Sequence, residues 1–227
     1  LEKRMDKARK LQKADKRYRI ELDLMERIRD NLEKGIPSRN LSFTEEESRL
    51  VDQMFLLTSK PVIYAANIAE EEIGKSPEDL PMVKSVTDQA EKENAEVLII
   101  CAKIEEEIAQ LEPNEKNAFL QELGIPESGL DRLVRHCYRL LGLISFLTAG
   151  PKEVRAWTIK SGTKAPQAAG KIHSDFEKGF IRAEIVPYGT LIRLGSCQAA
   201  RESGLVRSEG KDYIMKDGDV VLFRFNV

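Results

Sequence analysis

Two continuous apolar runs constrain the fold of this chain more than any other feature. The first, "PVIYAAN", covers residues 61–67, and the second, "AEVLIICAK", covers residues 95–103. Apolar runs of this length without alternating polar residues are typical of strands that are buried on both faces, as in parallel sheets. The intervening residues 78–93 have the pattern of a helix. A strand, a helix and a second strand in this order predict a parallel pair joined by a right-handed crossover, and therefore an α/β fold.

Residues 1–34 carry the pattern of one long, charged helix. Gly35 and Pro37 end this helix, since glycine is favoured just past a helix and proline shortly beyond it. The sequence "TEEE" from Thr44 to Glu47 is a capping box that starts a second helix, which ends near Leu57. We therefore predict that residues 1–59 form an antiparallel helical hairpin. Its apolar residues recur at coiled-coil-like spacings of three, four or seven: Leu1, Met5, Ala8, Leu11, Tyr18, Leu22, Met25 and Leu32.

The pattern of the chain changes after Gly142. Three predicted strands, "EVRAWTI", "GFIRAEIV" and "VVLFRFNV", alternate there with turns rich in Gly, Pro and Asp. This pattern of strands and turns predicts a compact α+β unit with a mixed sheet that packs on a helix. Further helices are predicted near residues 104–111, 114–122, 127–141, 166–171 and 196–203. The predicted domains are the hairpin, an α/β domain and the α+β unit, at residues 1–59, 60–142 and 143–227.

The composition is typical of a soluble protein, with 41% apolar and 33% charged residues. No run of 18 apolar residues is present that would predict a membrane span, and no secretory leader is visible. Cys101, Cys137 and Cys197 are widely separated, and two histidines are too few for a multi-histidine site. We therefore expect neither a disulfide framework nor a metal site, and a cytoplasmic location.

The formal net charge of −2 conceals an uneven distribution. Residues 1–35 carry 12 Lys and Arg against 8 Asp and Glu, and residues 150–227 carry 13 against 9. The segment between them has a net charge of −10. A polyanion would therefore meet the two ends of the chain, although ordinary solvated helix faces explain the same distribution.

The residues after the first strand include a partial match to a phosphate-binding loop. Gly74–Ser76 matches the end of the pattern G-x-x-x-x-G-K-[ST]. However, Ala69 stands where the first glycine is required, and Glu70–Glu72 would place three carboxylates beside the phosphates. Pro77 would also remove an amide from the helix start. We therefore do not predict a phosphate loop here, which leaves a base-recognition segment or a plain strand-to-helix turn.

The base-recognition interpretation rests on two short segments. GTPases read guanine with N-K-x-D after one strand and contact the base with S-A-K after the next. This chain has "NIAE" from Asn67 to Glu70 and "CAK" from Cys101 to Lys103, at the carboxyl ends of adjacent predicted strands, where open α/β sheets bind ligands. Ile68 replaces the lysine that flanks the ring, and Glu70 replaces the guanine-reading aspartate, so the preference for guanine should fall. Adenine offers an amine donor and a ring acceptor, which Asn67 and the backbone of "CAK" would satisfy.

These two segments, together with a longer block, resemble the Obg-like ATPase (YchF) family. The block is "TAGPKEVRAWTIKSGTKAPQAAGKIHSDFEKGFIRAE" from Thr148 to Glu184, and the chain ends in the similar "DGDVVLFRFNV". The resemblance covers essentially the whole chain. It implies a P-loop (G-type) nucleotide-binding domain that is interrupted by a helical hairpin and followed by a β-grasp domain of the TGS type.

The resemblance also implies a function. It implies that ATP is preferred over GTP, that hydrolysis depends on Mg²⁺, and that the protein associates with ribosomes and translation factors. The phosphate loop, switch segments and magnesium ligands precede the hairpin in this family, so the resemblance implies no catalytic residue within this chain. Hydrolysis is therefore expected of the intact family protein and not of this chain alone. The implied base-binding residues are Asn67, Ile68, Glu70, Cys101, Ala102 and Lys103.

Two classes of function remain open at this point. One is a nucleotide-switch ATPase, of which this chain holds the base-recognition segments. The other is a non-catalytic interaction module, in which the hairpin and the last domain bind ribosomal RNA or protein. Several lysines of the last domain suit phosphate contacts, although a solvated surface explains them equally well: Lys152, Lys160, Lys164 and Lys171.

Overall fold

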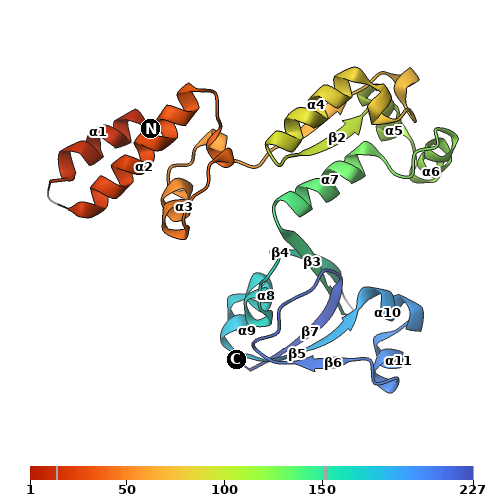
Figure 1. The fold of residues 1–227 in the computed structure, drawn as a ribbon. Helices are drawn as coiled ribbons and strands as arrows, with labels where there is room; N and C mark the ends of the chain where they lie inside the picture. The colour runs from red at the N-terminus through yellow and green to blue at the C-terminus, as the bar shows by residue number, and fades with distance from the viewer. Residues whose placement is uncertain (14, 151–152, 227) are drawn as a thin grey trace. The chain divides into compact units, whose positions relative to one another are not determined.

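The structure is a computed structural model that describes residues 1–13, 15–150 and 153–226 (Figure 1). The chain divides into two compact units, Leu1–Leu133 and Val134–Val227. The first contains most of the helices and a two-stranded sheet, and the second is built around a five-stranded sheet. None of the helices in the described ranges is both long and apolar enough to cross a lipid bilayer.

The N-terminal segment forms two helices, α1 (Glu2–Leu11) and α2 (Lys16–Glu33), so the prediction of one helix over residues 1–34 is wrong. Asp15 caps the start of α2, where its side chain accepts a hydrogen bond from the Arg17 N–H at 2.9 Å. Aspartate favours such capping positions over helix interiors. The break escaped the spacing pattern because Leu11 and Tyr18, on either side of it, are seven residues apart.

The two helices pack side by side (Figure 1). A third helix, α3 (Glu45–Asp52), lies on α2 through Leu24, Ile28 and Val51. The predicted capping box is confirmed, since Thr44 Oγ1 accepts from the Glu47 N–H and the Glu47 carboxylate accepts from the Thr44 N–H. However, α3 ends at Asp52 and not near residue 57. Two 3₁₀ turns flank α3, η1 (Ser38–Asn40) and η2 (Leu57–Ser59).

The predicted parallel strand pair is confirmed. Strand β1 (Ile63–Asn67) lies parallel to β2 (Glu96–Ile100), with Asn67 opposite Ile100 and helix α4 (Pro81–Lys92) between the two strands in sequence. Strand β2 ends before Cys101, whereas the sequence predicted a strand to residue 103. The remaining elements of this unit are η3 (Glu70–Glu72), η4 (Pro77–Asp79), α5 (Ala102–Gln110), α6 (Pro113–Glu122) and the start of α7 (Gly129–Leu140).

The second unit has a mixed sheet with the strand order β4-β3-β7-β5-β6. Strands β3 and β7 are parallel, and the other pairs are antiparallel. This arrangement agrees with the expected α+β class, although β3, β6 and two helices were not anticipated. The elements are β3 (Leu143–Ala149), β4 (Val154–Lys160), α8 (Ala165–Ile172), α9 (Ser174–Lys178), β5 (Phe180–Pro187), α10 (Tyr188–Leu194), α11 (Cys197–Glu202), β6 (Arg207–Glu209) and β7 (Asp219–Phe225).

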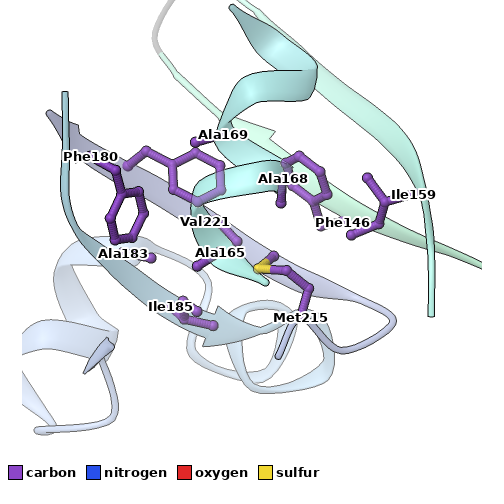
Figure 2. Packing of buried hydrophobic residues seen from close by; sticks show 11 residues of the cluster. Phe146, Ile159, Ala165, Ala168, Ala169, Phe180, Ala183, Ile185, Met215 and Val221 are labelled. Atoms are coloured by element: carbon purple, nitrogen blue, oxygen red, sulfur yellow. The ribbon is translucent and has the colours of Figure 1, made fainter. Parts of the chain in front are cut away.

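Helix α8 packs against one face of this sheet (Figure 2). Its buried residues Ala165, Ala168 and Ala169 have small side chains, which allow the helix backbone to lie close to the strands. Phe146 and Phe223 meet edge to face beneath it, with ring centroids 5.8 Å apart. Such aromatic pairs add to the free energy gained by burying apolar area.

Candidate functional site

The structure brings the two strand-end segments together. The side-chain oxygen of Asn67, the last residue of β1, accepts a hydrogen bond from the Ala102 N–H at 2.9 Å. The Ile68 N–H donates to the Ile100 carbonyl at 2.8 Å, which continues the strand pairing by one step. The segments "NIAE" and "CAK" therefore lie side by side at the carboxyl edge of the parallel pair.

The "CAK" segment is the start of a helix and not a loop. Cys101 is the N-cap residue of α5, and Ala102 and Lys103 form its first turn. The first amides of a helix lack partners within the helix, and Asn67 supplies one for Ala102. Since an amide N–H donates, the atom of Asn67 that faces it is the oxygen. Among the described residues, none accepts a hydrogen bond from Asn67 Nδ2, so this donor is available to a ligand.

Glu70 forms an ion pair across the same edge. Its carboxylate lies 2.6 Å from Lys103 Nζ, and the side chains of Glu70 and Lys103 are 45% and 67% exposed. The hydrogen bond to Glu70 and its negative charge raise the pKa of the Lys103 ammonium group. An ion pair this exposed contributes little to folding stability. The ion pair instead determines where the Glu70 carboxylate lies, which is beside Lys103.

Ile68 and Cys101 face the protein interior. Cys101 is buried in a cluster with Ile104, Ile108 and Leu120, and the half-buried Ile68 packs against that cluster. The Cys101 thiol is free of a disulfide. Ile68 is therefore held firmly by neighbouring side chains, and its role as the cover of a base remains a prediction.

The turn at Gly74–Ser76 differs from a phosphate-binding loop. Gly74 has a φ of +80°, which glycine adopts without strain, and η4 follows before α4 begins at Pro81. A phosphate loop instead leads directly into the N-terminus of a helix. Gly74 and Lys75 line a pocket of about 240 Å³ together with Ile68, Ile73 and Cys101. This volume lies below the roughly 300–1,000 Å³ of most ligand pockets.

Two residues that support this edge were missed by sequence reasoning. Arg132 of α7 donates from Nη2 to the Ile99 carbonyl at 2.7 Å, and its Nε is buried without a partner. The Glu105 carboxylate accepts from the N–H groups of Gly129 and Leu130 at the start of α7. No sequence signal identifies these contacts, because each joins residues more than 20 positions apart.

Magnesium does not fit the described residues. Within the described ranges, no group of three or more His, Cys, Asp or Glu side chains is arranged to hold a metal ion. The carboxylates nearest to the strand ends, Glu70 and Glu72, pair with Lys103 Nζ and the Ala69 N–H.

The predicted phosphate-contacting lysines differ in their surroundings. Lys152 lies outside the described residues. Lys160 and Lys171 are exposed. Lys164 forms an ion pair with Asp212 at 2.7 Å, so part of its charge is already balanced.

The fold and the strand-end residues together place the chain among α/β proteins with a nucleotide-binding-like fold. A family profile described as YchF-GTPase_C, protein of unknown function (DUF933), matches residues 143–226. The chain is 51% identical to the ribosome-binding ATPase YchF of Bacillus subtilis, across 100% of this chain and 62% of that protein. It is 38% identical to Obg-like ATPase 1 of Caenorhabditis elegans, across 98% of this chain and 56% of that protein.

Solved structures of related proteins resemble this chain as well. The Schizosaccharomyces pombe YchF GTPase matches with a TM-score of 0.84 and 30% identity, over 98% of this chain and 61% of that one. A GTP binding protein from Pyrococcus horikoshii, at 20% identity and a TM-score of 0.53, shares the fold across 90% of this chain and 56% of its own. The chain belongs to the YchF family of Obg-like ATPases. It spans 62% or less of the length of these relatives.

Proposed function

We propose that this chain forms the base-recognition part of a nucleoside-triphosphate site that prefers ATP to GTP. The observation that carries the proposal is the convergence of Asn67 with Ala102 and of Glu70 with Lys103 at the carboxyl edge of β1 and β2. Ligands of open α/β sheets bind at this edge.

The chemistry of the edge suits adenine better than guanine. Guanine presents a ring N–H and an amine on one side, and both require an acceptor such as a carboxylate. The Glu70 carboxylate is directed toward Lys103 and is one methylene longer than the guanine-reading aspartate, so it serves a guanine poorly. Adenine presents a ring nitrogen acceptor beside its amine. Asn67 Nδ2 donates to that nitrogen, and the half-buried Ile68 covers one face of the ring.

The wider role follows from the relatives. Proteins named ribosome-binding ATPase YchF match the whole of this chain, which supports an ATPase that associates with ribosomes in the cytoplasm. ATP would be bound in part by the strand-end residues. Hydrolysis is proposed for the intact protein, in line with the relatives that are named ATPases. A TGS-type β-grasp domain, a helical hairpin and translation-factor partners are part of the same proposal.

Titration of the full-length encoded protein with ATP and with GTP tests this function. The wild-type protein should bind ATP more tightly. Asn67→Ala removes both the ligand donor and the acceptor for Ala102, and should weaken ATP binding by about tenfold. Lys75→Gln is the control, because Lys75 lies in the turn that is not a phosphate loop, and should leave ATP affinity unchanged. Equal affinity for both nucleotides, or loss of ATP binding with Lys75→Gln alone, would contradict the proposal.

A non-catalytic interaction module is the second candidate. The second unit has a self-contained aromatic and aliphatic core, which suits a binding domain that works without nucleotide chemistry. Ribosome binding by the 227-residue chain that is independent of added ATP would favour this function.

A further inference from the structure

One face of the five-stranded sheet carries an arginine cluster. Arg182 of β5 lies directly opposite Arg224 of β7, and Glu184 lies opposite Leu222, so all four side chains share one face. The alternate residues Ala183 and Phe223 point to the other face and are buried in the core with α8. The arginine face is therefore the side of the sheet away from that core.

Three guanidinium groups converge on one carboxylate. Arg224 donates to both Glu184 oxygens, from Nε at 3.0 Å and from Nη2 at 3.3 Å. Arg201 of α11 donates to Glu184 at 3.0 Å, and Arg182 donates at 3.4 Å. These hydrogen bonds and charges, of which those of Arg224 are the largest, lower the pKa of Glu184 to about 2. The carboxylate is thus ionised, and it balances only one of three positive charges.

The arginines remain accessible although they are paired. The side chains of Arg182, Arg201 and Arg224 are 54%, 51% and 48% exposed, whereas that of Glu184 is 13% exposed. An arginine has five N–H donors, and Glu184 uses one or two from each. The cluster therefore presents a net charge of about +2 and several free donors to solvent.

We propose that this arginine face, formed by Arg182, Arg201 and Arg224 around Glu184, binds the phosphate backbone of RNA. Guanidinium groups match phosphate oxygens in geometry as well as in charge. Glu184 holds the three side chains in place before binding, which reduces the entropy lost on association. Leu222, 44% exposed on the same face, adds apolar contact beside the charges. This inference rests on the proposed association with ribosomes, and identifies the surface that would make the contact.

The test uses the full-length encoded protein, with purified ribosomal RNA and intact ribosomes as the two probes. The variant R182Q/R201Q/R224Q/E184Q removes the cluster without leaving an unpaired carboxylate, and changes the net charge by −2. The variant K178Q/K211Q has the same change in charge on exposed residues elsewhere in the second unit. A third variant, E184Q alone, keeps all three arginines and raises the net positive charge of the face.

The quadruple variant should bind RNA at least tenfold more weakly than K178Q/K211Q. The slope of log affinity against log salt concentration should be smaller in magnitude by about two for the quadruple variant, because each phosphate contact contributes about 0.7–0.9 to that slope. E184Q should bind as tightly as the wild type or more tightly, because the glutamine oxygen still accepts a hydrogen bond from the arginines while the face gains positive charge. Equal RNA binding by the quadruple variant and its control would overturn the inference. Loss of ribosome binding with unchanged RNA binding would also overturn it, since the face would then bind a protein. Absence of ribosome binding by the wild type would instead contradict the proposed function.

Discussion

At the residue scale, Asn67 has two separable tasks. Its oxygen satisfies the Ala102 N–H at the start of α5, and its Nδ2 is the donor that we assign to the base. The first task concerns local structure and the second concerns binding. A substitution that keeps one and removes the other can distinguish them.

Asn67→Asp is such a substitution. The carboxylate still accepts from the Ala102 N–H, and a negative charge near a helix N-terminus is favourable, so thermal stability should be unchanged or slightly higher. The donor to the ring nitrogen is lost, so ATP affinity should fall by about tenfold. Calorimetric titration and thermal unfolding measure the two effects. Unchanged ATP affinity would show that Asn67 does not contact the base.

Sequence reasoning identified this residue set but not its contacts. Asn67 and Ala102 could be expected to approach, because both lie at the carboxyl ends of adjacent parallel strands. The ion pair of Glu70 with Lys103 could not be predicted from the sequence. It depends on the first turn of α5 starting at Ala102, where a strand was expected. No sequence pattern indicated the arginine face, since its members come from β5, α11 and β7.

At the element scale, the junction between α9 and β5 depends on a close backbone approach. A Cβ at Gly179 would overlap the backbone of Asn226, whose N–H donates to the Gly179 carbonyl at 2.9 Å. Gly179→Ala should therefore destabilise the second unit by about 1–3 kcal/mol. Trp157, the one tryptophan of the chain, lies in this unit, so its fluorescence during urea unfolding reports the loss.

Gly189→Ala is the matched control. Gly189 lies in α10, and a Cβ there would meet nothing within 4 Å. Alanine favours helices over glycine, so this substitution should be neutral or stabilising by up to about 1 kcal/mol. Equal stability of the two alanine variants would contradict the close approach at Gly179.

The Glu184 cluster makes the second unit sensitive to acid. The pKa of Glu184 is lowered to about 2 in the folded state, against 4.5 for the ordinary group. Its contribution to stability is therefore fully present above about pH 4.5, and it is lost as the pH falls toward 2. Glu184→Gln should flatten the decline in unfolding free energy between about pH 4.5 and pH 2, measured through Trp157. An identical decline in both proteins would show that other carboxylates account for it.

The ends of the helices were the features of the fold that the sequence predicted least well. Apolar spacing alone joined α1 and α2, because the pattern continued across Asp15. The capping box at Thr44 was predictable, because both of its hydrogen bonds are local in sequence. Strand β3 was overlooked because only two residues, Leu141 and Gly142, separate it from the end of α7.

At the scale of the whole molecule, two units carry two proposed activities. The strand edge of the first unit suits an adenine base, and the arginine face of the second suits RNA. The α/β class followed from the two apolar runs at residues 61–67 and 95–103, and the α+β class followed from the change in pattern after Gly142. The pairing order of the five strands did not, because it depends on contacts between distant segments such as β3 and β7.

The most direct test of the central claim changes the base preference of the full-length encoded protein. Ile68→Lys with Glu70→Asp restores the guanine-reading pattern, and the aspartate, one methylene shorter than the glutamate, should lose the ion pair with Lys103. Titration with both nucleotides should then show GTP affinity rising relative to ATP by roughly five- to a hundred-fold, the value of one well-placed hydrogen-bonded acceptor. An unchanged ratio of ATP to GTP affinity, in a variant that unfolds at the wild-type temperature, would show that residues 67–70 do not read the base.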